Sequence, residues 1–201
     1  KWPDGKLIAY FQARTNTYAP VEELKKKFEP VLNYPNVIGL AIATRPDAIT
    51  EECLDYLEDL SKRTYLMVEL GLQTIHETTS KLINRCHTTK EFDEMVKKLR
   101  DRNINVIVHI INGLPYESKE MMLETAKHIN QLDIQGIKIH MLHIVKNTPL
   151  ATMYQKNPFH VLTRDEYVDI TIEQLEQLRP EIVIHRITGD PVREDLIAPT
   201  W

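Results

Sequence analysis

The stretch Val106-Ile-Val-His-Ile-Ile-Asn-Gly-Leu-Pro115 decides the fold of this chain. Its first six residues predict a buried strand, its Gly-Leu-Pro ending predicts a turn, and residues 118–131 have the apolar spacing of a helix. A strand that is apolar on both faces and leads into a helix is typical of a parallel sheet covered by helices. The stretch therefore predicts one βα unit of an α/β protein.

The same alternation of strand and helix recurs along the chain. Further strands are expected at residues 7–11, 37–42, 65–70, 137–142 and 182–185, and further helices at 21–32, 50–62, 77–84, 90–102 and 163–178. Thr50 and Thr163 are expected to cap their helices, and residues 147–162 to form a loop. Because the strand starts recur at roughly 30 residues, the length of a βα unit, we expect about six parallel strands with outer helices.

Two architectures fit this alternation: a closed or partial (βα) barrel, and an open doubly wound sheet. No Gly-x-Gly-x-x-Gly turn follows the first strand, and the chain has only 6 glycines. A dinucleotide site of the kind found in doubly wound sheets is therefore poorly supported, and the barrel is favoured.

Composition restricts the class of protein further. A length of 201 residues fits one domain, or one domain with a short extension. The formal net charge of −4 excludes a globally basic nucleic-acid surface, and no apolar run reaches the roughly 18 residues of a membrane span. The first residue is Lys1 and no signal peptide follows it, so we expect the natural N-terminus to be missing and the location to be cytoplasmic.

The chain has 2 cysteines, Cys53 and Cys86. This number excludes a disulfide scaffold, and it excludes a multi-thiolate metal cluster held by this chain alone.

Polar side chains gather where the expected strands end, which is where parallel α/β folds place their working residues. They include Gln12, Thr15, Asn16, Arg45, Glu69, Gln73, His109, Lys138, His140, His143, Lys146 and Arg186. So many polar strand ends predict a polar ligand. Structural alternatives stay open, because Glu69 could form a buried ion pair and His109 a hydrogen-bonded core position. A zinc site at His140 and His143 would require the strand to end between them.

Several motifs in fixed order resemble one family. Val68-Glu-Leu-Gly-Leu-Gln-Thr74, Leu82-Ile-Asn-Arg-Cys-His87 and Ile111-Asn-Gly-Leu-Pro115 resemble the radical S-adenosylmethionine (SAM) enzymes, in the branch that includes the Elongator catalytic subunit and the coproporphyrinogen dehydrogenases. Further stretches resemble a bacterial Elongator-like group, namely residues 10–20, 44–47, 136–143, 185–190 and 198–201.

The resemblance implies a partial (βα) barrel of the radical SAM type over residues 1–146, lacking its first βα unit, and a C-terminal extension over residues 147–201 packed on the barrel. It implies an enzyme that cleaves SAM reductively, beside a [4Fe–4S] cluster, to a 5′-deoxyadenosyl radical that abstracts hydrogen from an unknown substrate. The cluster ligands would lie in a Cys-x3-Cys-x2-Cys loop upstream, so the chain alone is expected to be inactive. The implied partners are an electron donor such as flavodoxin or ferredoxin and a substrate that could be RNA, with no membrane.

Site residues follow from the same resemblance. Gln73, and Arg85 twelve residues later, match family positions that face the ribose and carboxylate of SAM. The implied SAM contacts are Gln12, Thr15, Asn16, Glu69, Gln73, Arg85 and His109, and the implied substrate contacts are Arg45, Lys138, His140, His143, Lys146 and Arg186. The family's Gly-Gly-Glu-type segment is absent at residues 12–16, and Ala43 and His109 stand where relatives have Glu and Asp. No catalytic residue or metal ligand is assigned.

Two other functions stay open. One is a non-redox (βα) barrel that binds a ligand through Gln73, Arg85 and the histidines, and the other is RNA engagement, to which the charge of −4 gives no independent support. A Cys-x3-Cys-x2-Cys loop just upstream would decide for radical chemistry, because only that chemistry needs three thiolates.

Overall fold

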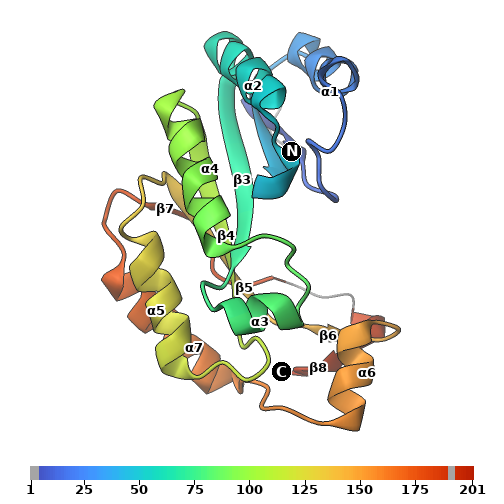
Figure 1. Ribbon diagram of the computed structural model, residues 1–201, viewed down its shortest axis with the longest axis vertical. Helices are drawn as coiled ribbons and strands as arrows, with labels where there is room; N and C mark the ends of the chain where they lie inside the picture. The colour runs from blue at the N-terminus through green and yellow to red at the C-terminus, as the bar shows by residue number, and fades with distance from the viewer. Residues whose placement is uncertain (1–4, 190–192) are drawn as a thin grey trace. The chain divides into compact units, whose positions relative to one another are not determined.

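The computed structural model describes residues 5–189 and 193–201. These residues form two compact units (Figure 1). Unit 1 comprises 5–71, Lys90–Val108 and Asp133–Gln135, and unit 2 comprises Leu72–Thr89, His109–Leu132 and the described residues from Gly136 onward. Asp190, the last residue of one of the family-like motifs, lies outside the described residues.

Six strands form one sheet in the order β1-β2-β3-β4-β5-β7. Their bounds are β1 Leu7–Phe11, β2 Val37–Thr44, β3 Tyr65–Gln73, β4 Asn105–Asn112, β5 Gly136–Met141 and β7 Val183–Arg186. Pairing is parallel between β1 and β2, between β2 and β3, and between β5 and β7. Strands that are neighbours in the sheet follow one another along the chain with helices between them, as the alternation of apolar runs predicts.

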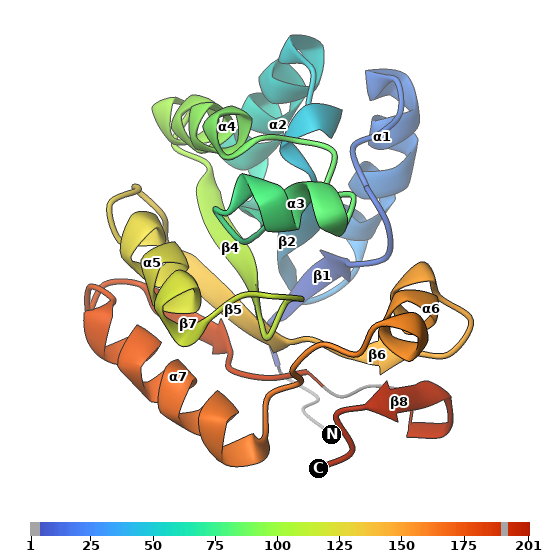
Figure 2. The ribbon, with the colours of Figure 1, turned by 60° about the horizontal axis from the view of Figure 1, so that its bottom comes forward.

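Three helices belong to unit 1: α1 (Val21–Phe28), α2 (Glu51–Arg63) and α4 (Thr89–Asp101). Helix α2 begins as predicted, because the Thr50 side chain accepts a hydrogen bond from the backbone N–H of Cys53 at 3.2 Å. Its residues Leu54, Leu57 and Leu60 are completely buried, and Figure 2 shows α1 and α2 beside β1 and β2. The i, i+3 spacing of these leucines gives α2 one apolar face, and that face forms part of the core of unit 1.

Helices α3 (Glu77–Leu82), α5 (Lys119–Ile129), α6 (Pro149–Lys156) and α7 (Arg164–Gln177) belong to unit 2. Helices α5 and α7 run side by side in both ribbon views. The amide groups of Asn112 and Gln174 exchange two hydrogen bonds of 2.8 and 2.9 Å, and these bonds join the end of β4 to α7. Both side chains are almost completely buried, so this pair satisfies polar groups inside the core of unit 2.

Two predictions about individual elements are wrong. The expected loop 147–162 contains α6, because Pro149 occupies the first helical turn, where its missing N–H costs nothing, and the Thr148 side chain caps the N–H of Ala151. Residues 7–11 are expected to form a buried strand, but β1 is an edge strand of the sheet and Leu7 is 53% exposed; β7 is the other edge strand, and Val183 is 57% exposed.

A second, two-stranded sheet was not predicted. Strand β6 (Ile144–Val145) pairs antiparallel with β8 (Leu196–Ala198). Within the described ranges, no helix has the length and apolar character needed to cross a membrane.

Candidate cofactor and substrate site

In unit 1, Asn16 fastens the loop after β1 to the neighbouring strand. Its side-chain N–H groups donate to the carbonyl oxygens of Phe11 (2.8 Å) and Ala43 (2.9 Å), and its Oδ1 accepts from the Lys27 ammonium at 2.6 Å. Asn16 is 5% exposed, whereas Gln12 is exposed. Both ends of the Asn16 amide are therefore engaged within the protein, and the SAM contacts expected from the loop 12–16 stay predictions.

Two carboxylates of unit 1, Glu69 in the middle of β3 and Asp47 in the turn after β2, have partners in the same unit. The Tyr10 hydroxyl donates to Oε2 of Glu69 at 2.7 Å, and Glu69 is 2% exposed. Arg45 holds Asp47 through two bonds, from Nε to Oδ1 at 3.0 Å and from Nη2 to Oδ2 at 2.5 Å. Arg45 thus forms a local ion pair at the rim of β2, and its predicted role as a substrate contact stays untested.

In unit 2, Gln73 ends β3 with a left-handed backbone, at a φ of 66°. Its side chain is half-buried, and its amide makes no hydrogen bond with any residue of 5–189 or 193–201. A half-buried amide with open donors and acceptors at a strand end is suited to bind the hydroxyl groups of a ligand.

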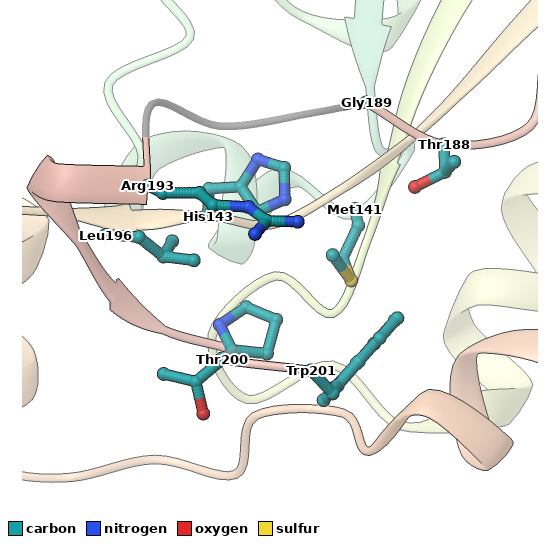
Figure 3. Close-up of a pocket in the computed structure, with 9 residues that line it drawn as sticks. Met141, His143, Thr188, Gly189, Arg193, Leu196, Thr200 and Trp201 are labelled. Carbon is teal, nitrogen blue, oxygen red and sulfur yellow. The ribbon is translucent and has the colours of Figure 1, made fainter.

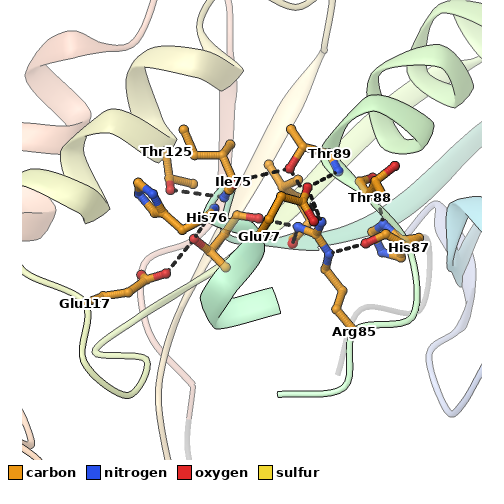
Figure 4. A network of polar contacts seen from close by, with 11 residues as sticks. Ile75, His76, Glu77, Arg85, His87, Thr88, Thr89, Glu117 and Thr125 are labelled. Carbon is orange, nitrogen blue, oxygen red and sulfur yellow. Dashed lines mark hydrogen bonds and ion pairs between the residues drawn. The ribbon is translucent and has the colours of Figure 1, made fainter. Parts of the chain in front are cut away.

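Arg85 holds the segment that follows Gln73 (Figure 4). Its Nε donates to the carbonyl oxygen of His87 at 2.8 Å, and its Nη1 donates to the carbonyl oxygens of Leu72 (3.0 Å) and Thr74. Its Nη2 donates to Oε1 of Glu77 at 3.3 Å and to Oγ1 of Thr89 at 3.5 Å. A guanidinium has five N–H donors, so these contacts use all of them.

The rest of this network holds the loop between β3 and α3 from both sides. The Thr74 hydroxyl donates to Oε1 of Glu117 at 2.6 Å, and the Thr89 backbone N–H donates to Oε1 of Glu77 at 2.8 Å. The hydrogen bond from Thr89 is the main reason that the pKa of Glu77 lies below its ordinary value. Burial raises the pKa of Glu117, although the bond from Thr74 acts in the opposite direction.

Four of the predicted site residues come together on β4, β5 and β7 of unit 2; we call them the His140 cluster (His109, Lys138, His140 and Arg186). Nε2 of His140 lies 3.2 Å from Nδ1 of His109, and the two rings stack with centroids 5.1 Å apart. Lys138 is 9% exposed and pairs in register with Arg186 across β5 and β7. A Cβ on Gly189 would lie 3.6 Å from the His140 ring and 4.0 Å from the Arg186 guanidinium. The cluster therefore concentrates cationic and proton-carrying groups in one place.

The two other predicted substrate residues of unit 2 lie beyond β5. His143 lines a cavity of about 700 Å³ together with Met141, Thr188, Arg193 and Trp201 (Figure 3). Lys146 is instead used as a structural tie, because its ammonium donates to the carbonyl oxygen of Glu194 at 2.7 Å.

Sequence reasoning did not find this cavity. Trp201 belongs to a motif that resembles the family, but no role followed from it. No sequence pattern points to Arg193, because it is the pairing of β6 with β8 that brings this residue near His143.

The thiols of this chain do not fit an iron–sulfur cluster. Three thiolates are needed and the chain has 2 cysteines. Cys53 is buried in α2, where burial raises the pKa of its thiol to about 12. Cys86 is exposed and its Sγ donates to the carbonyl oxygen of Asn84. In the described residues, no group of three or more His, Cys, Asp and Glu side chains is arranged to hold a metal ion.

Comparison with known proteins identifies two matching families. Residues 2–129 match the family described as "Radical SAM superfamily", and residues 134–201 match the "Radical_SAM C-terminal domain". "Uncharacterized protein YtqA" of Bacillus subtilis is 55% identical over 201 residues, and "Uncharacterized protein MJ0486" of Methanocaldococcus jannaschii is 39% identical over 198 residues. These alignments cover 100% and 98% of this chain, and 62% of the length of each relative.

One solved structure has the same fold. "The archaeal Methanocaldococcus infernus Elp3 with N-terminus deletion (1-46)" superposes with a TM-score of 0.84 at 20% identity. The match covers 97% of this chain and 50% of the other. The predicted fold class, an α/β partial (βα) barrel of the radical SAM type with six parallel strands, is thereby confirmed.

Proposed function

Because the chain belongs to the radical SAM superfamily, we propose that it supplies the SAM-binding and substrate-positioning part of an enzyme that abstracts hydrogen from its substrate. When bound, SAM and an iron–sulfur cluster supply the carbon radical for that abstraction. The cluster thiolates do not come from this chain, so the following steps concern only what its own residues hold and orient.

The observation that carries the proposal is the open amide of Gln73. It stands at the end of β3, where the family resemblance expects the SAM ribose, and it has no partner among the described residues. An amide donates through its NH₂ group and accepts through its oxygen, so it can bind a pair of vicinal hydroxyls. Gln73 is therefore our first choice for a direct contact with SAM.

Arg85 supports this contact from behind. The carboxylate contact predicted for it would have to replace one of the five bonds that it already makes. Because two of those bonds hold the carbonyl groups on either side of Gln73, we assign Arg85 the role of a positioning residue. It fixes the backbone from which the Gln73 side chain reaches the ligand.

The His140 cluster is our proposal for the substrate-facing part of unit 2. Two imidazoles in contact can pass a proton between them, and Lys138 and Arg186 add positive charge beside them. The role of these residues is to orient a polar or anionic group of the substrate. RNA as that substrate, the electron donor, the domain boundary at residue 146 and the cytoplasmic location all stay predictions.

Isothermal titration of the purified protein with SAM tests the proposal. Replacing Gln73 by Ala removes two hydrogen-bonding groups and should weaken SAM binding by about five- to tenfold, the effect of roughly one hydrogen bond. Gln131→Ala, an exposed glutamine after α5, is the matched control and should bind SAM like the unaltered protein. Equal SAM affinity of the Gln73→Ala variant would remove Gln73 from the site.

A further inference from the structure

The function proposed above assigns no task to the cavity in unit 2. Its volume of about 700 Å³ lies within the range of small-molecule sites, roughly 300–1,000 Å³. Its walls come from the end of β5 (Met141), from the segment after β7 (Thr188) and from the β8 segment (Arg193, Trp201) (Figure 3). The cavity therefore lies within one compact unit.

The aromatic wall of the cavity is anchored. The indole N–H of Trp201 donates to the carbonyl oxygen of Leu162 at 2.9 Å, and its ring lies 6.0 Å from the ring of Tyr167. The Tyr167 hydroxyl in turn donates to the carbonyl oxygen of Ile187 at 2.6 Å. Trp201 is 47% exposed, so part of its surface is available to a flat ligand.

The backbone that carries the cationic wall is anchored as well. Lys146 donates through its ammonium to the carbonyl oxygen of Glu194 and through its backbone N–H to that of Asp195 (2.8 Å), and β8 begins at the next residue. These bonds hold the short helical turn Arg193–Asp195 against β6. In the part of the chain that the structure describes, no acidic side chain pairs with the Arg193 guanidinium, and none of the residues lining the cavity is acidic.

We infer that this cavity binds a small anion with a flat aromatic or heteroaromatic ring. The Trp201 face and the Met141 thioether suit the ring, because both make favourable contacts with aromatic surfaces. The Arg193 guanidinium suits a phosphate or carboxylate, which it can hold with two parallel hydrogen bonds. The hydroxyls of Thr188 and Thr200 offer donors and acceptors to ring heteroatoms.

The charge distribution favours a free small molecule over a nucleic acid chain. The exposed residues that directly follow Arg193 are Glu194 and Asp195, and the chain carries a net charge of −4. A polynucleotide needs a track of cations for its successive phosphates, whereas a single anionic group needs only one. Met141, which lines the cavity, directly follows His140 of the cluster that we propose to face the substrate. The inference therefore rests on the proposed function, and it names the chemical class of that substrate.

The test measures the fluorescence of Trp201. The chain has 2 tryptophans, so in a Trp2→Phe background the tryptophan emission reports on the cavity. The probes are the four nucleoside 5′-monophosphates and 3-phenylpropionate, which together sample heteroaromatic phosphates and aromatic carboxylates and do not emit at the wavelengths of tryptophan. We expect saturable quenching by at least one probe, and at least about tenfold weaker binding of the matching nucleoside, or of 3-phenylpropan-1-ol, because both lack the anionic group.

Variants separate the cavity from the rest of the molecule. Arg193→Gln should weaken binding of the probe about tenfold or more, whereas Lys90→Gln, an exposed charge on α4, should leave it unchanged. Thr188→Val keeps the shape of that side chain and should weaken the heteroaromatic probes more than 3-phenylpropionate, whose ring has no heteroatom. Thermal melting of each variant identifies a loss of binding that is due to unfolding.

The inference would be overturned by no saturable quenching with any probe, by equal binding of the Arg193→Gln variant, or by tighter binding of a short mixed-sequence RNA than of every small probe. Competition by SAM would also overturn it, because the cavity would then belong to the SAM site. Since none of these measurements needs radical chemistry, failure here leaves the Gln73 result intact. Loss of SAM binding in turn leaves the fluorescence result intact.

Discussion

At the scale of single residues, Arg85 illustrates both what a sequence motif can identify and what it cannot. The motif placed Arg85 near the cofactor site, but its five hydrogen bonds to the protein show a side chain that holds a loop. It is 6% exposed, and three of its partners are carbonyl groups. Removing such a side chain leaves buried acceptors without donors, which costs more than the net value of the bonds themselves.

The first prediction concerns this side chain. Arg85→Met should lower the free energy of unfolding by about 2–4 kcal/mol, because a buried, hydrogen-bonded cation is removed and its acceptors are left unsatisfied. Urea denaturation followed by circular dichroism measures the change. Arg164→Met, which removes an exposed arginine whose one ion pair among residues 5–189 and 193–201 is with Asp165, should stay within about 0.5 kcal/mol. Unaltered stability of Arg85→Met would show that Arg85 does not hold the loop.

The second prediction concerns Glu117. Burial raises the pKa of this carboxyl, so it binds its proton more tightly in the folded than in the unfolded state. The contribution of this carboxyl to the free energy of unfolding is therefore present at acidic pH, and it is lost as the pH rises through the folded-state pKa. Glu117→Gln keeps an acceptor for the Thr74 hydroxyl and should be more stable than the unaltered protein at neutral pH, with the gain disappearing at acidic pH. Urea titrations at both pH values measure this difference, and an equal gain at both would contradict the assignment.

The third prediction concerns the two thiols. Iodoacetamide at mildly alkaline pH should label exposed Cys86 in the native protein and spare Cys53, whose thiol is buried and has a pKa of about 12. Mass spectrometry of tryptic peptides counts the labels, with urea-unfolded protein as the control in which both cysteines react. Rapid labelling of Cys53 in native protein would mean that α2 opens readily.

At the scale of elements, local capping explains where the helices begin. Thr163 forms a capping box on α7: its hydroxyl accepts from the backbone N–H of Glu166 at 3.3 Å, and Oε2 of Glu166 accepts from the backbone N–H of Thr163 at 2.7 Å. This pattern is fully visible in the sequence, because cap and partner are three residues apart. Helix α6 has an equally local cap at Thr148, but Pro149 directly after it was interpreted as a loop signal.

The fourth prediction tests the cap of α7. Thr163→Ala should lower the free energy of unfolding by about 1 kcal/mol, because one backbone N–H at the helix start loses its acceptor. Thr152→Ala is the matched control, since its hydroxyl lies inside α6 and donates to the carbonyl oxygen of Thr148 at 3.4 Å. The control should change stability by less than about 0.5 kcal/mol. Equal effects of the two changes would show that the cap does not stabilise α7.

At the scale of the whole molecule, the number of thiols determines whether the chain alone can hold an iron–sulfur cluster. A family that uses an iron–sulfur cluster is represented here by a chain with 2 cysteines, one of them inside a helix. The chain spans 62% of the length of its two curated relatives, so the activity of the whole protein is a matter of proposal.

The fifth prediction follows from the number of cysteines. The 201-residue chain, reconstituted anaerobically with iron and sulfide, should not retain a stoichiometric [4Fe–4S] cluster after desalting, because it cannot supply three thiolates. Iron and sulfide analysis with the absorption spectrum measures the yield, and a Cys53→Ser, Cys86→Ser double variant is the control. A full cluster in the unaltered chain that is lost in the double variant would contradict the prediction.

The sequence by itself determined the alternation of strands and helices, the positions of the Thr50 and Thr163 caps and the family. Each of these depends on neighbours a few residues apart, or on motifs whose order survives in the chain. Only the tertiary structure decided that β1 and β7 are exposed edges, that all five Arg85 donors bind protein groups, that His109 contacts His140, and that Arg193 and Trp201 share a cavity. The physical reason is the same in all four cases: burial and hydrogen-bond partners depend on which distant segments pack together, and no local pattern encodes that choice.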